Sequence, residues 1–168
     1  MGERAALPPG AAGGRRLSAG DVLLIDAAVT SGCYWADVTR CATVWPPSDE
    51  VTAAWDAVMA AHAAGVAAAG PGATASDVDR AAREEIVERG LGEAFIHRTG
   101  RGLGLEVHEA PYLSSTSGEV LQPGMVVTIE PGVYLRGRFG LRLEDGVLVT
   151  ESGGEILTEA IPSGLRAL

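Results

Sequence analysis

Four carboxylates lie inside stretches that otherwise have the composition of buried strands. Asp26 and Asp37 occur in LLIDAAVTSGCYWADVTR, Glu130 occurs in MVVTIEPGVY, and Glu144 occurs in LRLEDGVLVT. An ionised carboxylate is costly to remove from water unless a positive group pairs with it. Four of them in one small chain therefore indicate a shared cation, and oxygen ligands suit hard divalent ions such as manganese or magnesium.

A purely structural interpretation of these acids stays open. Arg40 and Arg142 lie close in sequence to Asp37 and Glu144, and structural ion pairs also occupy strands. On that interpretation the chain is an acidic scaffold whose carboxylates serve only as ion-pair partners.

A glycine-punctuated stretch, FIHRTGRGLGLEVHEAPYL, lies between the two pairs of acids. Gly100, Gly102 and Gly104 recur at every second residue, a spacing that lets a ligand or another backbone approach closely. A phosphate loop is the weaker interpretation, because GRGLGL lacks the Walker pattern and no clear helix follows it. The pattern favours a glycine-rich strand beside a polar site.

The first two acids need a hairpin to bring them together. Ser31 and Gly32 supply a turn between strands predicted at 21–29 and 34–44, so Asp26 and Asp37 can face each other across it. Further strands are predicted at 125–134, 141–150 and 155–157. All four acids converge if the two hairpins lie side by side in one sheet.

Two antiparallel helices are predicted between these groups of strands. The first follows a Ser48 N-cap and ends before residues 70–72, and His62 on its apolar stripe is interpreted as a core residue. The second begins at a capping box formed by Thr74 and Asp77 and ends at Gly90. We therefore expect an α+β domain in which a helix pair covers one face of a mainly antiparallel sheet.

Composition limits the possible partners and compartments. The 168 residues suffice for one domain, and a net charge of −9 with a pI near 4.7 argues against nucleic acid and anionic membrane surfaces. No apolar run was expected to have the length of a membrane span, roughly 18 to 20 residues. Two cysteines are weak grounds for a disulfide, so a cytoplasmic location is the expectation. Residues 1–20 are predicted to be a flexible lead-in, 21–160 the domain and 161–168 a tail.

At its four acids the chain resembles the pita-bread-fold metallopeptidases, the family of methionine aminopeptidase, Xaa-Pro aminopeptidase, prolidase and creatinase. The Xaa-Pro peptidase branch is the most similar. IDAAVTSGCYWADVTR resembles its first metal motif, PGMVVTIEPGVY and LRLEDGVLVT resemble its two glutamate motifs, and FIHRTGRGLGLEVHE covers its histidine motif.

The resemblance implies a hydrolase that cleaves the N-terminal bond of a peptide, most often one with proline second, by means of a metal-bridging hydroxide. It also implies two divalent ions, of manganese, cobalt or zinc. The implied metal ligands are Asp26, Asp37, Glu130 and Glu144, the implied catalytic residues are His108, Glu130 and His97, and the implied substrate-binding residues are His97, His108 and Arg142.

One departure from the family pattern affects the metal site directly. The family motif GHG reads Gly100-Arg101-Gly102 here, and a guanidinium has no lone pair with which to ligate a metal. Arg101 could instead replace the missing ion by pairing with Glu130. A second hypothesis is therefore a catalytically degenerate member that acts as a binding module.

Two further departures lie near the start of the chain. The histidine that usually follows the family's Ala-Leu-Pro motif is absent, because Pro9 follows Ala6-Leu7-Pro8. The family's first helix pair is also missing, which predicts an N-terminally truncated domain with an uncovered apolar sheet face. We expect a second copy or a partner chain to cover that face.

Overall fold

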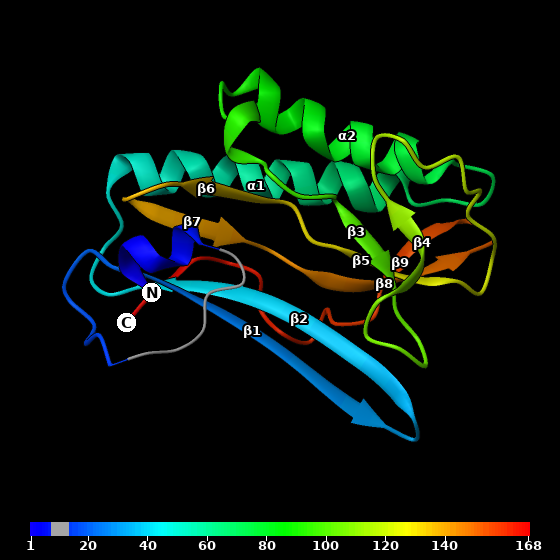
Figure 1. Cartoon of the computed structure of the whole chain (residues 1–168), viewed down its shortest axis with the longest axis horizontal. Helices are drawn as coiled ribbons and strands as arrows, with labels where there is room; N and C mark the ends of the chain where they lie inside the picture. Colours follow the sequence, from blue (N-terminus) through cyan, green and yellow to red (C-terminus); the bar gives the residue numbers. More distant parts are fainter. Residues whose placement is uncertain (8–13) are drawn as a thin grey trace.

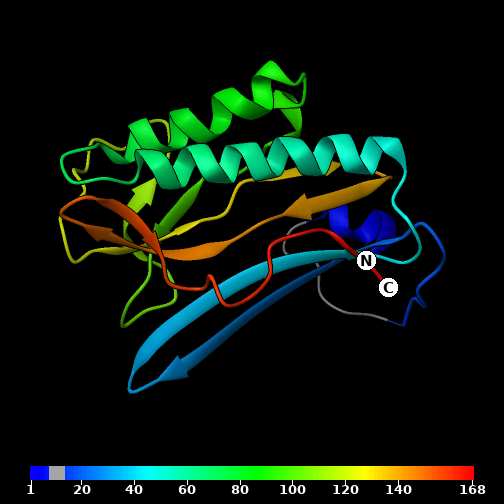
Figure 2. The ribbon, with the colours of Figure 1, turned by 180° about the vertical axis from the view of Figure 1, so that it is seen from behind.

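A computed structural model describes residues 1–7 and 14–168. Two helices lie on one side of the strands, and a long hairpin projects from the other side (Figures 1 and 2). The elements are η1 (Gly2–Ala6), β1 (Val22–Ser31), β2 (Tyr34–Thr43), α1 (Asp49–Ala68), α2 (Ala75–Glu88), η2 (Gly92–Ala94), β3 (Gly100–Gly102), β4 (Glu109–Leu113), β5 (Val126–Ile129), β6 (Gly132–Leu135), β7 (Phe139–Arg142), β8 (Asp145–Thr150), β9 (Gly153–Ile156) and β10 (Arg166–Ala167).

The strands form separate sheets rather than one. Their orders are β1-β2-β10, β4-β3-β5-β8-β9 and β6-β7. All pairings are antiparallel except that of β10 with β2. The two hairpins do not share one sheet, which was the stated condition for the four acids to converge: within the described residues, β2 is bridged to the central strands between Thr39 and Glu144.

The β1–β2 hairpin places its two aspartates on one face. Its tight turn uses Gly32 and Cys33, both with positive φ, one residue later than predicted. Asp26 lies opposite Thr39 and Asp37 lies opposite Ala28, so the two acids are offset by two positions instead of being directly opposed. Because side chains alternate along a strand, both still point to the same side.

Both helices begin as the sequence predicts. The Ser48 side chain accepts a hydrogen bond from the Val51 amide, and Thr74 and Asp77 form a reciprocal capping box. With 20 residues and a mean hydropathy of 1.2, α1 does reach the length and apolarity of a membrane span, contrary to expectation. Its buried residues pack in the main core with those of α2 and the strands, as in a core helix.

The two long strands predicted at 125–134 and 141–150 are both broken. Glu130 and Pro131 separate β5 from β6, and Pro131 has no amide hydrogen with which to continue a ladder. Leu143 and Glu144 separate β7 from β8. At each break the backbone amide bonds to a segment distant in sequence. The Glu130 amide donates to Thr99 O at 2.7 Å, and the Glu144 amide donates to Thr39 O at 3.2 Å. Both glutamates therefore sit where strands end, not within them.

The chain ends are more ordered than predicted. η1 lies where a flexible lead-in was expected, and its contact with β7 is close enough that a Cβ on Gly140 would lie 2.0 Å from Ala5 O. At the other end, β10 pairs with β2. Pro8 and Pro9, on which the missing-histidine prediction rests, lie outside the described residues. The domain boundaries at 20 and 160 stay predictions.

Candidate metal centre

Three of the four predicted acids converge. One carboxylate oxygen each from Asp26, Asp37 and Glu144 lies within 4.8 Å of the others. Asp37 and Glu144 are buried, whereas the Asp26 side chain is 51% exposed and opens the cluster to solvent. Glu130 joins them through a shared neighbour, the Arg101 guanidinium.

Arg101 is held among the acids by the two glycines that flank it. A Cβ on Gly100 would lie 1.8 Å from Thr128 O, and one on Gly102 would lie 2.2 Å from Ala110 O, so only glycine allows β3 to pack this closely between β4 and β5. The glycine-rich strand beside a polar site is thereby confirmed, and the Arg101 side chain it carries is only 3% exposed.

The Arg101 guanidinium contacts three carboxylates from three separate segments. Its Nη2 donates to Asp37 Oδ2, its Nη1 lies 3.2 Å from Glu144 Oε1, and its Nε lies 3.7 Å from Glu130 Oε1. The expected pair with Glu130 is therefore the longest of the three. Among the described residues, Nε and Nη1 of Arg101 and Oε1 of Glu144 have no aligned hydrogen-bond partner. The guanidinium fills this space without matching all the oxygens around it.

The donor set does not fit a pair of metal ions. Asp26, Asp37 and Glu144 offer oxygens that suit one hard divalent cation. The remaining position, next to Glu130, faces a fixed positive charge where an imidazole ligand would be needed. We therefore derive no reaction step through two ions in this chain.

Burial raises the pKa of two acids in this cluster. Burial is the main cause that raises the pKa of Glu144 to about 8, and the neighbouring Glu130 and Asp37 carboxylates contribute to the same rise. Burial likewise raises the pKa of Glu130, against the opposing effect of Arg101. Two guanidiniums thus do not balance four acids, and the cluster favours binding further positive charge.

Arg142 belongs to the same cluster, and the ion-pair interpretation of the sequence is only partly right about it. Arg142 Nη2 donates to Asp26, and its Nε donates to Thr39 Oγ1 at 3.0 Å. The Thr39 hydroxyl in turn donates to Glu144 Oε2 at 2.6 Å, while Arg142 Nε lies 3.9 Å from that oxygen. Asp37, by contrast, pairs with Arg101 and not with Arg40.

His97 lies beside this cluster in a fixed tautomer. Its Nδ1 is 2.7 Å from the Arg98 carbonyl and must donate, so its Nε2 accepts from the Tyr134 hydroxyl at 2.9 Å. Arg142 Nη1 approaches the same hydroxyl at 3.4 Å. Burial lowers the pKa of His97 to about 4, so the imidazole is neutral near pH 7.

His108 lies at the rim, in the exposed loop between β3 and β4. Partial burial and then the charge of Arg101 lower its pKa. The backbone of the same loop reaches the hairpin, because the Trp35 amide donates to Gly104 O at 2.9 Å.

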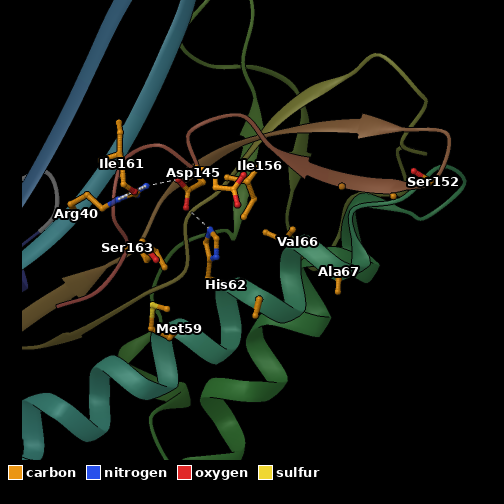
Figure 3. A pocket seen from close by; sticks show the side chains of 15 residues that line it. Arg40, Met59, His62, Val66, Ala67, Asp145, Ser152, Ile156, Ile161 and Ser163 are labelled. Atoms are coloured by element: carbon orange, nitrogen blue, oxygen red, sulfur yellow. Dashed lines mark hydrogen bonds and ion pairs between the residues drawn. The ribbon is translucent and has the colours of Figure 1, made fainter.

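A second buried acid, Asp145, faces the opposite side of the sheet and was missed by sequence reasoning. It accepts hydrogen bonds from Arg40 at 2.6 Å and from Thr158, and His62 Nε2 lies 3.0 Å from its other oxygen. Arg40, His62 and Asp145 line a cavity of about 610 Å³. Figure 3 shows their side chains pointing toward one another. The core interpretation of His62 is confirmed. The sequence did carry a signal for Asp145: it directly follows Glu144, and neighbouring side chains along a strand point to opposite faces.

Comparison with known proteins identifies the family of this chain. Residues 1–151 match the model of metallopeptidase family M24. The chain belongs to family M24. It is 44% identical over 158 residues to the Xaa-Pro dipeptidase of Pyrococcus furiosus, which covers 94% of this chain and 45% of that protein.

Solved structures agree with this M24 assignment. The X-Pro aminopeptidase of Thermotoga maritima superimposes with a TM-score of 0.95 at 42% identity, covering 99% of this chain and 47% of that one. The Xaa-Pro dipeptidase of Bacillus anthracis gives 0.96 at 41% identity, covering 99% and 47%. The fold is thus the pita-bread α+β fold, and the M24 chain spans about half the length of the relatives it matches.

Proposed function

We propose that this M24 chain binds peptides with proline at the second position, and that its hydrolysis of their N-terminal bond is strongly reduced. The peptide class comes from the relatives named Xaa-Pro dipeptidase and X-Pro aminopeptidase. The observation that carries the loss of turnover is the Arg101 guanidinium bonded among the acids.

The charge of the site suits the amino end of a peptide. Four carboxylates surround only two guanidiniums, and Asp26 brings this excess of negative charge to the surface. A peptide ammonium is attracted to such an opening. His97 and Tyr134 form one wall beside the cluster, with their polar atoms bonded to each other, and the exposed His108 lies at the rim, where a peptide can reach it.

Metal-dependent hydrolysis, as the names of the relatives describe, is the second candidate function. It is favoured by the three oxygens of Asp26, Asp37 and Glu144 within 4.8 Å of one another. A divalent ion held there would act as a Lewis acid on a peptide carbonyl. Arg101 opposes this function because it denies the site a second ion and a ligand.

Titration calorimetry with the dipeptide Leu-Pro, in EDTA and in MnCl2, tests the binding proposal. N-acetyl-Leu-Pro lacks the ammonium and Leu-Ala lacks the proline, so each removes one proposed recognition element. We expect Leu-Pro to bind more tightly than both, and Asp26→Asn to weaken it. Equal affinities for all three ligands would contradict the proposal.

Release of free proline from Leu-Pro separates the two candidate functions. In MnCl2 we expect Arg101→His to release proline at least roughly 10 to 100 times faster than the native protein. Changes to residues that merely orient metal ligands already cost that much, and Arg101 stands at a ligand position. A native rate equal to that of the variant would favour the hydrolase.

A further inference from the structure

Arg101 is a buried cation with no route to neutrality. A guanidinium is a permanent cation in proteins and offers only hydrogen-bond donors. At 3% exposure it is held by Asp37, Glu144 and Glu130, which come from β2 and from the two strand breaks. A single side chain on β3 thereby contacts the β1–β2 hairpin and both of the breaks that connect the five-stranded sheet to the β6–β7 pair.

The charge of the cluster specifies how many more cations it accepts. A cation bound among the acids favours their ionised forms, and in that state Asp26, Asp37, Glu130 and Glu144 carry four negative charges while Arg101 and Arg142 carry two positive ones. The net charge is two negative units, which one divalent ion cancels. A second divalent ion would leave the cluster with two excess positive charges in a largely buried site, at high electrostatic cost.

The exposure of the acids places that one ion at the open end of the cluster, beside Asp26, whose carboxylate also accepts a hydrogen bond from Arg142 Nη2. Arg101 binds Asp37 and faces Glu144 and Glu130, so the inner end of the cluster already holds its positive charge. The outer end has Asp26, which is half exposed. Between the two ends, Glu144 Oε1 lies 3.2 Å from Arg101 Nη1 but makes no aligned hydrogen bond among the described residues, although its side chain is only 1% exposed, so it retains the capacity to bind a cation.

We infer that the Arg101 guanidinium replaces one metal ion as a permanent internal cation. The protein therefore folds without metal and takes at most one divalent ion, at Asp26, Asp37 and Glu144. This inference does not depend on peptide binding, since it concerns the stability and metal content of the free protein.

Native mass spectrometry of the protein equilibrated with MnCl2 and then desalted counts the bound ions directly. We expect no more than one Mn²⁺ per native chain and two in Arg101→His, which restores an imidazole ligand. Arg136→His makes the same chemical change at an exposed position and should bind as the native chain does. Two ions per native chain would overturn the inference, as would a folded Arg101→His that binds no more ions than the native chain.

Thermal unfolding in EDTA and in MnCl2 supplies a readout independent of ion counting. We expect the Tm of the native protein in EDTA to lie within a few degrees of its Tm in MnCl2. Arg101→Met removes the charge but keeps much of the volume, so its Tm in EDTA should fall by about 10 °C and recover with Mn²⁺. The inference is overturned if Arg101→Met melts like the native protein in EDTA, because the cluster would then need no internal cation.

Discussion

Glu144 and Asp145 are neighbours in sequence, yet they lie in two buried clusters of opposite character. Glu144 belongs to the front cluster, which consists of Asp26, Asp37, Glu130, Glu144, Arg101 and Arg142. Four acids share two guanidiniums there, and one oxygen of Glu144 has no aligned donor among the described residues. Asp145 points to the opposite face and belongs to the back cluster, which consists of Asp145, Arg40, Thr158 and His62. These three neighbours contact both of its oxygens.

The pKa values of the two carboxylates move in opposite directions. Burial raises the pKa of Glu144 to about 8. Burial alone would also raise that of Asp145, but its contacts with His62, Thr158 and Arg40 hold its pKa below the ordinary value. Each oxygen of Asp145 is thus contacted by Arg40, Thr158 or His62, whereas Glu144 Oε1 makes no aligned hydrogen bond among the described residues. From this contrast we expect the back cluster to stabilise the fold and the front cluster to bind ligands.

The largest effect should follow from breaking the back cluster. In Asp145→Asn, Arg40 and His62 lose their buried anion, and we expect the free energy of unfolding to fall by about 3–5 kcal/mol. Urea unfolding at pH 7 measures this change. Mn²⁺ should not restore the loss, because no metal site is involved.

Asp56→Asn is the matched control for this variant. Asp56 is exposed on α1, and its replacement should change stability by about 0.5 kcal/mol or less. If Asp145→Asn were as mild as this control, the back cluster would not be the structural one.

A smaller effect should appear when the front cluster is titrated. The folded pKa of Glu144, about 8, lies above its ordinary value of 4.5, so folding favours the protonated form. Stability from this group is fully present below pH 4.5 and is lost as pH rises through 8. Urea unfolding in EDTA between pH 5 and pH 8 should show this decline.

Glu144→Gln should flatten that decline, because the amide does not titrate. Saturating MnCl2 should reduce it in the native protein, since the ionised carboxylate then binds a cation. An identical slope in the native and Gln proteins would assign the pH dependence elsewhere and weaken the contrast between the two clusters.

The contact between His97 and Tyr134 should contribute less. Tyr134→Phe removes the hydroxyl that donates to His97 Nε2 and accepts from Arg142, at a cost of about 1 kcal/mol. Chemical unfolding measures the stability change, and calorimetry with Leu-Pro measures the effect on binding. Unchanged peptide affinity would remove this wall from the proposed site.

The smallest effect on stability should come from the outer face of the hairpin, away from both clusters. Ile25 and Val29 point away from Asp26 and are exposed, Val29 at 63%. Val29→Lys should change the free energy of unfolding by about 0.5 kcal/mol or less. We expect this face to be covered by a second copy, so the variant should dissociate more readily in sedimentation experiments. Equal association of both proteins would argue against that partner.

The sequence predicted local structure and residue types better than connectivity. The caps at Ser48 and Thr74 are local chemistry, so both helices were found. The breaks at Glu130 and Glu144 depend on hydrogen bonds to Thr99 and Thr39, which are distant in sequence, so continuous strands were predicted instead. Local patterns cannot show which strand a backbone amide will meet.

The site shows the same division. The acids were found because burying a carboxylate is costly, and Arg101 was recognised as the wrong residue for a metal ligand. That its strongest partner is Asp37 rather than Glu130 depends on the packing of β3 between its neighbours. Asp145 was missed although it directly follows Glu144, because only strand alternation indicates that its side chain points to the other face.

Anomalous scattering from crystals grown with MnCl2 tests the central claim most directly, because it locates each ion beside the Arg101 side chain. The structure predicts a single manganese peak among Asp26, Asp37 and Glu144, with the guanidinium still bound to Asp37. Two manganese peaks, with Arg101 displaced from the acids, would contradict it.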